Sequence, residues 1–95
     1  MPNEQERALK CDQLAAKFGR AAEKDDARAD EFRRWAVLKL QLAGEHPEAA
    51  ELRAVAEELI GVVAYWEERS AWSRDMAGRF RRRADEHRAR LLSGL

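Results

Sequence analysis

The chain contains few of the residues that form disulfide bonds or sharp turns: one cysteine, two prolines and five glycines among 95 residues. Its single cysteine, Cys11, cannot form an internal disulfide bond, so we expect a reduced thiol in a cytoplasmic protein. With 45% hydrophobic and 38% charged residues, the chain is neither collagen-like nor disordered. We therefore expect a single domain built from long helices.

Long hydrophobic runs are also missing. The longest apolar run, Leu59 to Trp66, contains Gly61 and is far too short to cross a bilayer. The first ten residues lack the basic and then apolar segments of a signal peptide. We therefore expect no membrane association and no signal peptide.

Sequence motifs typical of catalysis and metal binding are missing as well. The chain contains no glycine-rich phosphate loop, no Cys-x-x-Cys and no His-Glu-x-x-His. His46 and His87 lie far apart in the sequence, and the fold predicted below separates them further. We expect no metal, no cofactor and no enzymatic activity.

The strongest positive signal is the segment from Leu52 to Trp66. At 100° per residue, its apolar side chains fall within about 100° of arc, the stripe of an amphipathic helix. The stripe continues more weakly through Ser70, Ser73, Ala77, Phe80, Ala84 and Leu91. The pattern predicts one helix over about residues 47–93.

An earlier stripe predicts a first helix over about residues 3–43. Asn3 is placed to cap it, with Glu6 three residues later. Asp25 and Asp26 would break the helix if either capped a new one, but the apolar stripe keeps its phase across them, so we expect an unbroken helix. The stripe consists of Cys11, Leu14, Phe18, Ala21, Ala22, Ala29, Phe32, Ala36 and Ala43.

Gly44 and Pro47 punctuate the chain between the two helices. Glycine commonly follows a helix C-terminus and proline commonly opens the next helix, so we expect a turn at 44–47. A turn this short predicts an all-α, antiparallel helical hairpin. Opposed residue numbers would then sum to about 91, which places Phe32 opposite Leu59.

Near the turn, apolar side chains between Phe32 and Leu42 cover about 200° of arc, more than one neighbouring helix covers. We therefore expect two hairpins to form a homodimer, a four-helix bundle of coiled-coil type. The alternative is a monomeric bundle of three or four shorter helices, broken near Asp25 and Ser70. The predicted dimer interface consists of Phe32, Trp35, Leu38, Leu42, Leu52, Leu59, Val63 and Trp66.

Charge is distributed unevenly along the neutral chain. Residues 45–68 carry seven acidic side chains and one basic one, whereas residues 69–95 carry eight arginines and three acids. The arginines of the second segment either pair with Glu4, Glu6 and Asp12 or bind an acidic partner or phosphate. The candidates for such contacts are Arg81, Arg82, Arg88 and Arg90.

One flank of the second helix carries aromatic and arginine side chains outside the inner stripe. Trp, Tyr, Met and Arg are the residues enriched at binding hot spots. The predicted partner-binding set is Tyr65, Arg69, Trp72, Met76, Arg79 and Arg83. We therefore expect a non-enzymatic protein–protein interaction module: an adaptor, an inhibitor or a small subunit of a larger assembly. The alternative is a nucleic-acid-binding or regulatory protein that uses the arginine-rich C-terminal end.

Overall fold

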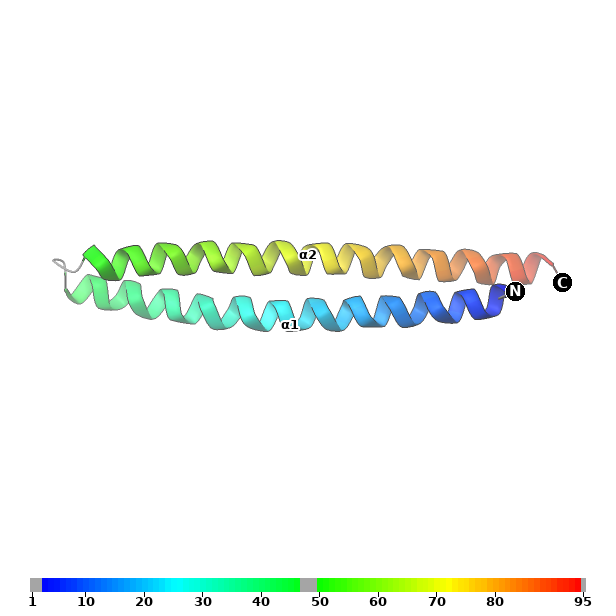
Figure 1. The fold of residues 1–95 in the computed structure, drawn as a ribbon, viewed down its shortest axis with the longest axis horizontal. Helices are drawn as coiled ribbons and strands as arrows, with labels where there is room; N and C mark the ends of the chain where they lie inside the picture. The colour runs from blue at the N-terminus through cyan, green and yellow to red at the C-terminus, as the bar shows by residue number, and fades with distance from the viewer. Residues whose placement is uncertain (1–2, 47–49, 95) are drawn as a thin grey trace. The chain divides into compact units, whose positions relative to one another are not determined.

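The computed structural model describes residues 3–46 and 50–94 and contains two long helices in these ranges, α1 (Glu4–Glu45) and α2 (Ala50–Ser93) (Figure 1). The helices pack together as a hairpin, and the described residues contain no strand. The predicted all-α hairpin is therefore confirmed.

Neither helix breaks where the alternative fold required it. α1 continues through Asp25 and Asp26, and α2 continues through Ser70. At the start of α1, the side-chain Oδ1 of Asn3 accepts a hydrogen bond of 2.8 Å from the backbone N–H of Glu6, which confirms the N-cap. A bundle of three or four shorter helices is thus wrong.

α1 ends later than the sequence indicated. α1 includes Gly44, whose φ is not positive, and the N–H of His46 still donates to the carbonyl of Leu42 at 3.0 Å. Gly44 therefore does not end the helix in a left-handed conformation, because the helical hydrogen bonds continue past it. The predicted role of Pro47 lies outside the described residues.

Because α1 ends later than predicted, the register between the two helices also differs from the prediction. Opposed residue numbers sum to about 95, as those of the helix ends Glu45 and Ala50 do, rather than to about 91. Phe32 is consequently level with Val63, not with Leu59. The predicted register is wrong by about one helical turn.

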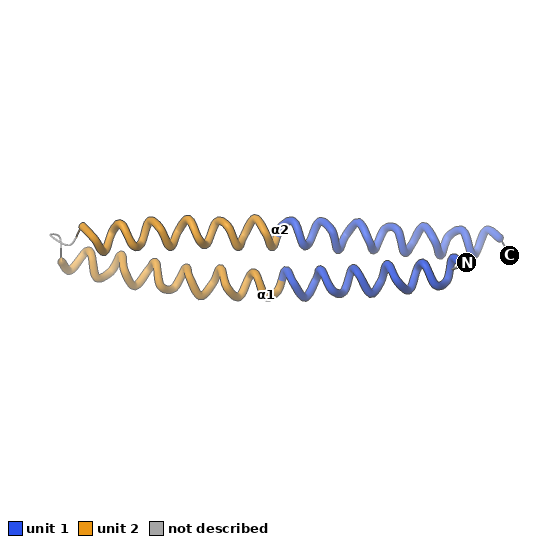
Figure 2. Tube along the Cα trace, in the orientation of Figure 1, with its two compact units in different colours: residues 1–22, 71–95 blue, residues 23–70 orange. Residues whose placement is uncertain are grey.

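The contacts of the chain define two compact units (Figure 2). Unit 1 comprises residues 1–22 and 71–95, and unit 2 comprises residues 23–70. Each unit contains one segment of α1 and one antiparallel segment of α2.

Small residues form the seam between the helices in both units. Buried positions recur every seven residues, the spacing typical of a coiled coil, and side chains of this size let the two backbones approach closely. In α1 these positions are Ala8, Ala15 and Ala22 in unit 1 and Ala29, Ala36 and Ala43 in unit 2. In α2 they are Ala56, Val63 and Ser70 in unit 2 and Ala77 and Ala84 in unit 1. The sequence stripes missed Ala8, Ala15 and Ala56.

A polar layer interrupts the seam in unit 2. Ser70 is 1% exposed, and its hydroxyl donates a hydrogen bond of 2.6 Å to Oδ1 of Asp26. The neighbouring carboxylate of Asp25 is also buried; its Oδ2 lies 3.5 Å from Nε of Arg69 and has no hydrogen-bond partner among the described residues. Polar groups in an apolar seam favour the one register that pairs them.

Candidate functional site

In unit 1, Trp72 is exposed and packs against an aromatic side chain of α1. It is 57% exposed, and its ring meets Phe18 edge to face, with centroids 5.6 Å apart. Phe18 in turn stacks on Phe80 at 5.8 Å, and the guanidinium of Arg83 lies 5.5 Å from the Phe80 ring. An exposed tryptophan packed against a half-buried phenylalanine offers a large apolar contact at little cost in conformational entropy.

Basic side chains lie on the same side of unit 1 as Trp72. Lys17 immediately precedes Phe18, and Lys10 lies seven residues earlier on the same helical face; both are exposed. Met76 follows Trp72 by one turn and is half-buried. We call this surface the Trp72 flank: Lys10, Lys17, Trp72, Met76, Arg79 and Arg83.

The other two residues of the predicted partner-binding set lie in unit 2. Tyr65 is 55% exposed and meets Trp66 edge to face at 5.0 Å. Arg69 donates a long hydrogen bond of 3.5 Å to the Tyr65 hydroxyl and lies 5.4 Å from the Trp66 ring, over which Arg28 also packs at 4.6 Å. Tyr65 and Arg69 are thus in contact with each other, whereas the other four members belong to unit 1.

All of the predicted dimer interface lies in unit 2. Within it, Val63 is buried in the seam of its own hairpin, while Trp35 and Leu38 are exposed. The remaining members, Phe32, Leu42, Leu52, Leu59 and Trp66, are half-buried. Trp35 and Leu38 on α1, with Val55 and Tyr65 on α2, form an exposed apolar surface that we call the Trp35 flank.

A second apolar surface in unit 2 was not identified from the sequence. It consists of Val37 and Leu40 on α1 and Ile60 on α2, and we call it the Ile60 flank. On this side of the seam Arg33 forms ion pairs with Glu67 on α2 and, at 2.6 Å, with Asp30; these carboxylates raise the pKa of Arg33. The wide apolar arc was the available signal, but it did not assign residues to the two sides of the seam.

The arginine-rich end is only partly neutralised. Arg88 pairs with Asp12 across the helices and with Asp85 at 3.2 Å along its own helix. Arg90 reaches Glu4 at 3.8 Å. Of the four candidate arginines, Arg88 and Arg90 therefore pair with acids that were predicted to neutralise them. The acid that pairs with Arg90, Glu4, also binds His87.

Arg79 pairs with Asp75 at 3.0 Å. For Arg81 and Arg82, by contrast, residues 3–46 and 50–94 provide no ion pair.

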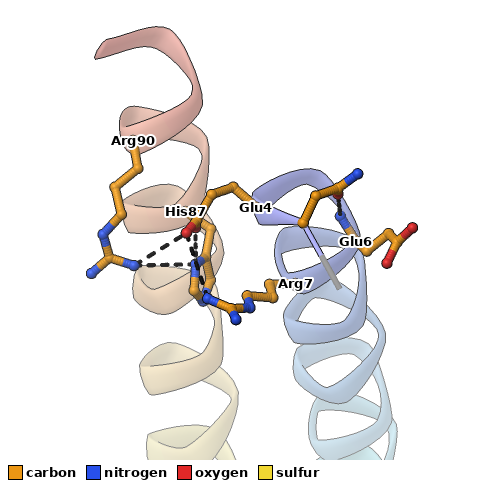
Figure 3. Close-up of polar contacts among 6 residues, drawn as sticks. Glu4, Glu6, Arg7, His87 and Arg90 are labelled. Atoms are coloured by element: carbon orange, nitrogen blue, oxygen red, sulfur yellow. Dashed lines mark hydrogen bonds and ion pairs between the residues drawn. The ribbon is translucent and has the colours of Figure 1, made fainter. Parts of the chain in front are cut away.

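Glu4 joins the start of α1 to the end of α2 (Figure 3). Its carboxylate oxygen Oε2 lies 2.5 Å from Nδ1 of His87, and Arg7 approaches Oε1 at 3.6 Å. The hydrogen bond with His87, assisted by the nearby arginines, lowers the pKa of Glu4. This carboxylate therefore remains charged in the folded hairpin to lower pH than in the unfolded chain.

A small pocket lies between α1 and α2 in unit 1. It has a volume of about 220 Å³ and is lined by Gln5, Ala8, Leu9, Asp12, Arg88 and Leu91. Its two charged residues already pair with each other. In the part of the chain that the structure describes, no group of three or more histidine, cysteine or carboxylate side chains is placed to hold a metal, and Cys11 is a free, half-buried thiol.

Neither described helix is long and apolar enough to cross a membrane.

Comparisons with protein-family models, with curated proteins and with solved structures gave no significant match.

Proposed function

We propose that this protein is a non-enzymatic interaction module that docks a helical surface onto a partner protein as an adaptor, an inhibitor or a small subunit of an assembly. The observation that carries the proposal is the exposure of Trp35, Tyr65 and Trp72, each about half accessible although both helices already have a partner helix. In unit 2, Trp35 and Tyr65 share the Trp35 flank with Leu38 and Val55, and monomeric proteins rarely leave several large apolar side chains grouped on one surface.

The chemistry of these surfaces supports docking rather than simple solvation. The Trp72 flank combines an aromatic anchor, a methionine and basic side chains, which is the composition of binding hot spots. In unit 2, apolar side chains remain exposed on both sides of the seam, at Leu38 and at Ile60. One docked helix pair covers one side only, so unit 2 has surface for more than one contact.

Homodimerisation is the second part of the proposal. A two-helix unit has a single internal interface, and burial of its exposed apolar side chains against a second copy would supply a four-helix core of coiled-coil type. The seven-residue spacing of buried positions supports this architecture. The unpaired thiol of Cys11 favours a reducing, cytoplasmic location.

Affinity capture from extract of the native host tests the docking proposal. Trp72→Ala should weaken capture of a specific protein by roughly 30-fold, the equivalent of about 2 kcal/mol, and Trp35→Ala with Leu38→Ala should act in the same direction. Leu92→Ala is the matched control, because Leu92 is 72% exposed and lies outside the flanks.

Circular dichroism should show unchanged helicity for every variant. A captured protein that wild type and all variants retain equally would contradict the proposal. Loss of helicity in Trp72→Ala would instead show that Trp72 belongs to the core.

A second candidate function is binding to nucleic acid through the arginine-rich end of α2. It is favoured by Arg81 and Arg82, which are exposed and have no ion pair within the described residues. A mobility shift with generic DNA and RNA that weakens steeply with salt would support it. Arg81→Ala with Arg82→Ala should then reduce the affinity, whereas no shift at low salt would reject it.

A further inference from the structure

The two units carry opposite net charges of equal size. Unit 1 contains eleven basic and six acidic side chains, a net charge of +5, whereas unit 2 contains seven basic and twelve acidic ones, a net charge of −5. The neutral chain is therefore strongly polarised between its units. A second copy of the same chain offers each unit a surface of opposite charge.

Charged side chains lie beside the apolar residues of both the Trp35 flank and the Trp72 flank. On the Trp35 flank, Glu31 lies seven residues before Leu38 and Glu58 lies seven residues before Tyr65, so both exposed acids share that side of unit 2. On the Trp72 flank, the exposed charged members Lys10, Lys17, Arg79 and Arg83 are all basic, and Glu86, seven residues after Arg79, is an exposed acid on the same side. Bases therefore predominate on the Trp72 flank, whereas the Trp35 flank carries Glu31 and Glu58 together with Arg69, which contacts Tyr65.

We infer that a second copy of this chain covers both surfaces in a two-fold dimer, with the Trp72 flank of unit 1 in one copy packed on the Trp35 flank of unit 2 in the other. The inference rests on the proposed docking function and names its partner. A two-fold axis makes the contact occur twice, so each copy supplies one Trp72 flank and one Trp35 flank. The interface thus combines residues predicted for partner binding, such as Trp72 and Met76, with Trp35 and Leu38, which were predicted for the dimer.

Charge decides between this arrangement and pairing through unit 2 alone. Unit 2 packed on unit 2 would juxtapose two net charges of −5, and like-charge juxtaposition opposes association. The reciprocal arrangement places +5 near −5 twice. Complementary charges also speed encounter and fix orientation, whereas the aromatic side chains supply the buried area.

The salt dependence of the wild-type dimer separates the two arrangements without any mutation. Sedimentation equilibrium would be measured between roughly 0.05 and 1 M NaCl, over which the Debye length falls from more than 10 Å to about 3 Å. The reciprocal dimer should dissociate more readily as salt rises, with a Kd increase of about tenfold or more. A dimer that tightens with salt, or a folded monomer throughout, would overturn the inference.

Charge reversal then tests the assigned surfaces. A basic-flank variant, Lys10→Glu with Lys17→Glu, should weaken the dimer, and so should an acidic-flank variant, Glu31→Lys with Glu58→Lys. A chain that carries all four substitutions should regain the dimer, because each reversed flank then meets a reversed partner. Failure of this rescue in a helical protein would overturn the inference.

Glu57→Lys with Arg20→Glu is the matched control, since both residues are exposed and lie outside both flanks. This pair should leave the Kd within about twofold of wild type.

The outcome also distinguishes this inference from the proposed function. If the protein is monomeric but Trp72→Ala still loses a captured host protein, the self-association fails and the docking function stands. If neither the dimer nor the captured protein is found, both fail.

Discussion

The hydroxyl of Ser70 on α2 donates a hydrogen bond of 2.6 Å to the carboxylate of Asp26 on α1, from a position that is 1% exposed. This contact joins the two helices of unit 2 in a seam otherwise dominated by alanine. It is compatible with one register only, because a shift of either helix by one turn separates the two residues by about 5 Å.

Ser70→Ala should lower the free energy of unfolding by about 1 kcal/mol, because it removes the donor and leaves Asp26 without this partner. Urea unfolding followed by circular dichroism measures the change. Ser93→Ala is the control: its hydroxyl bonds only within α2, to the carbonyl of Ala89, so its loss should cost little. Equal effects of the two substitutions would contradict a stabilising role for the contact between the helices.

Asp25→Ala should have the opposite sign and raise the free energy of unfolding by about 1 kcal/mol. The carboxylate is buried, its Oδ2 has no hydrogen-bond partner among the described residues, and Arg69 is exposed enough to be solvated when the acid is removed. Asp26→Ala provides the comparison, since it removes the acceptor of the Ser70 hydroxyl. If Asp25→Ala proves the more destabilising of the two, burial does not penalise this carboxylate as we argue.

Ala29→Leu should destabilise the fold by about 1–3 kcal/mol, because Ala29 is buried in the seam and a larger side chain would push the helices apart. Ala27→Leu, two residues earlier and exposed, makes the same chemical change outside the seam and should be nearly neutral. Thermal unfolding of both variants checks this. A more stable Ala29→Leu variant would contradict this, because it would show that the seam can accommodate a larger side chain.

Acid should loosen the end of the hairpin at Glu4 first. The pKa of Glu4 is lower in the folded chain than in the unfolded chain, so its contribution to stability is present above the unfolded value, about 4.3, and is lost as pH falls through the folded value. NMR amide signals from the first two turns of α1 should therefore shift as the pH falls below the unfolded pKa of Glu4, before global unfolding. Glu4→Gln should remove this step; an unchanged profile would mean that the contact with His87 adds no stability.

The helices themselves could be predicted because their signals are local. The N-cap at Asn3 and the stripe from Leu52 to Trp66 each depend on residues within a few turns, and α1 and α2 form where these signals occur. The position of the turn was harder to predict, because Gly44 is compatible both with ending a helix and with continuing it. The hydrogen bond of His46 to Leu42 continues the helix.

The candidate surfaces could be predicted only in part. The exposure of Trp72 followed from its angle to the apolar stripe, and the structure agrees. The Ile60 flank was missed because a wide apolar arc on one helix does not reveal which part its partner covers. The ion pairs of Arg88 and Arg90 are likewise set by which acids the other helix brings within reach.

The sequence by itself determined two amphipathic helices, the short connection that makes them antiparallel, and the alternation of acidic and basic segments. These depend on periodicity and composition, which a single helix already displays. Only the tertiary structure decided the register, the burial of Asp25 and Ser70, and the side of the seam on which each apolar residue lies. Contacts between two helices change with a shift of one turn, and such a shift leaves every local pattern in the sequence intact.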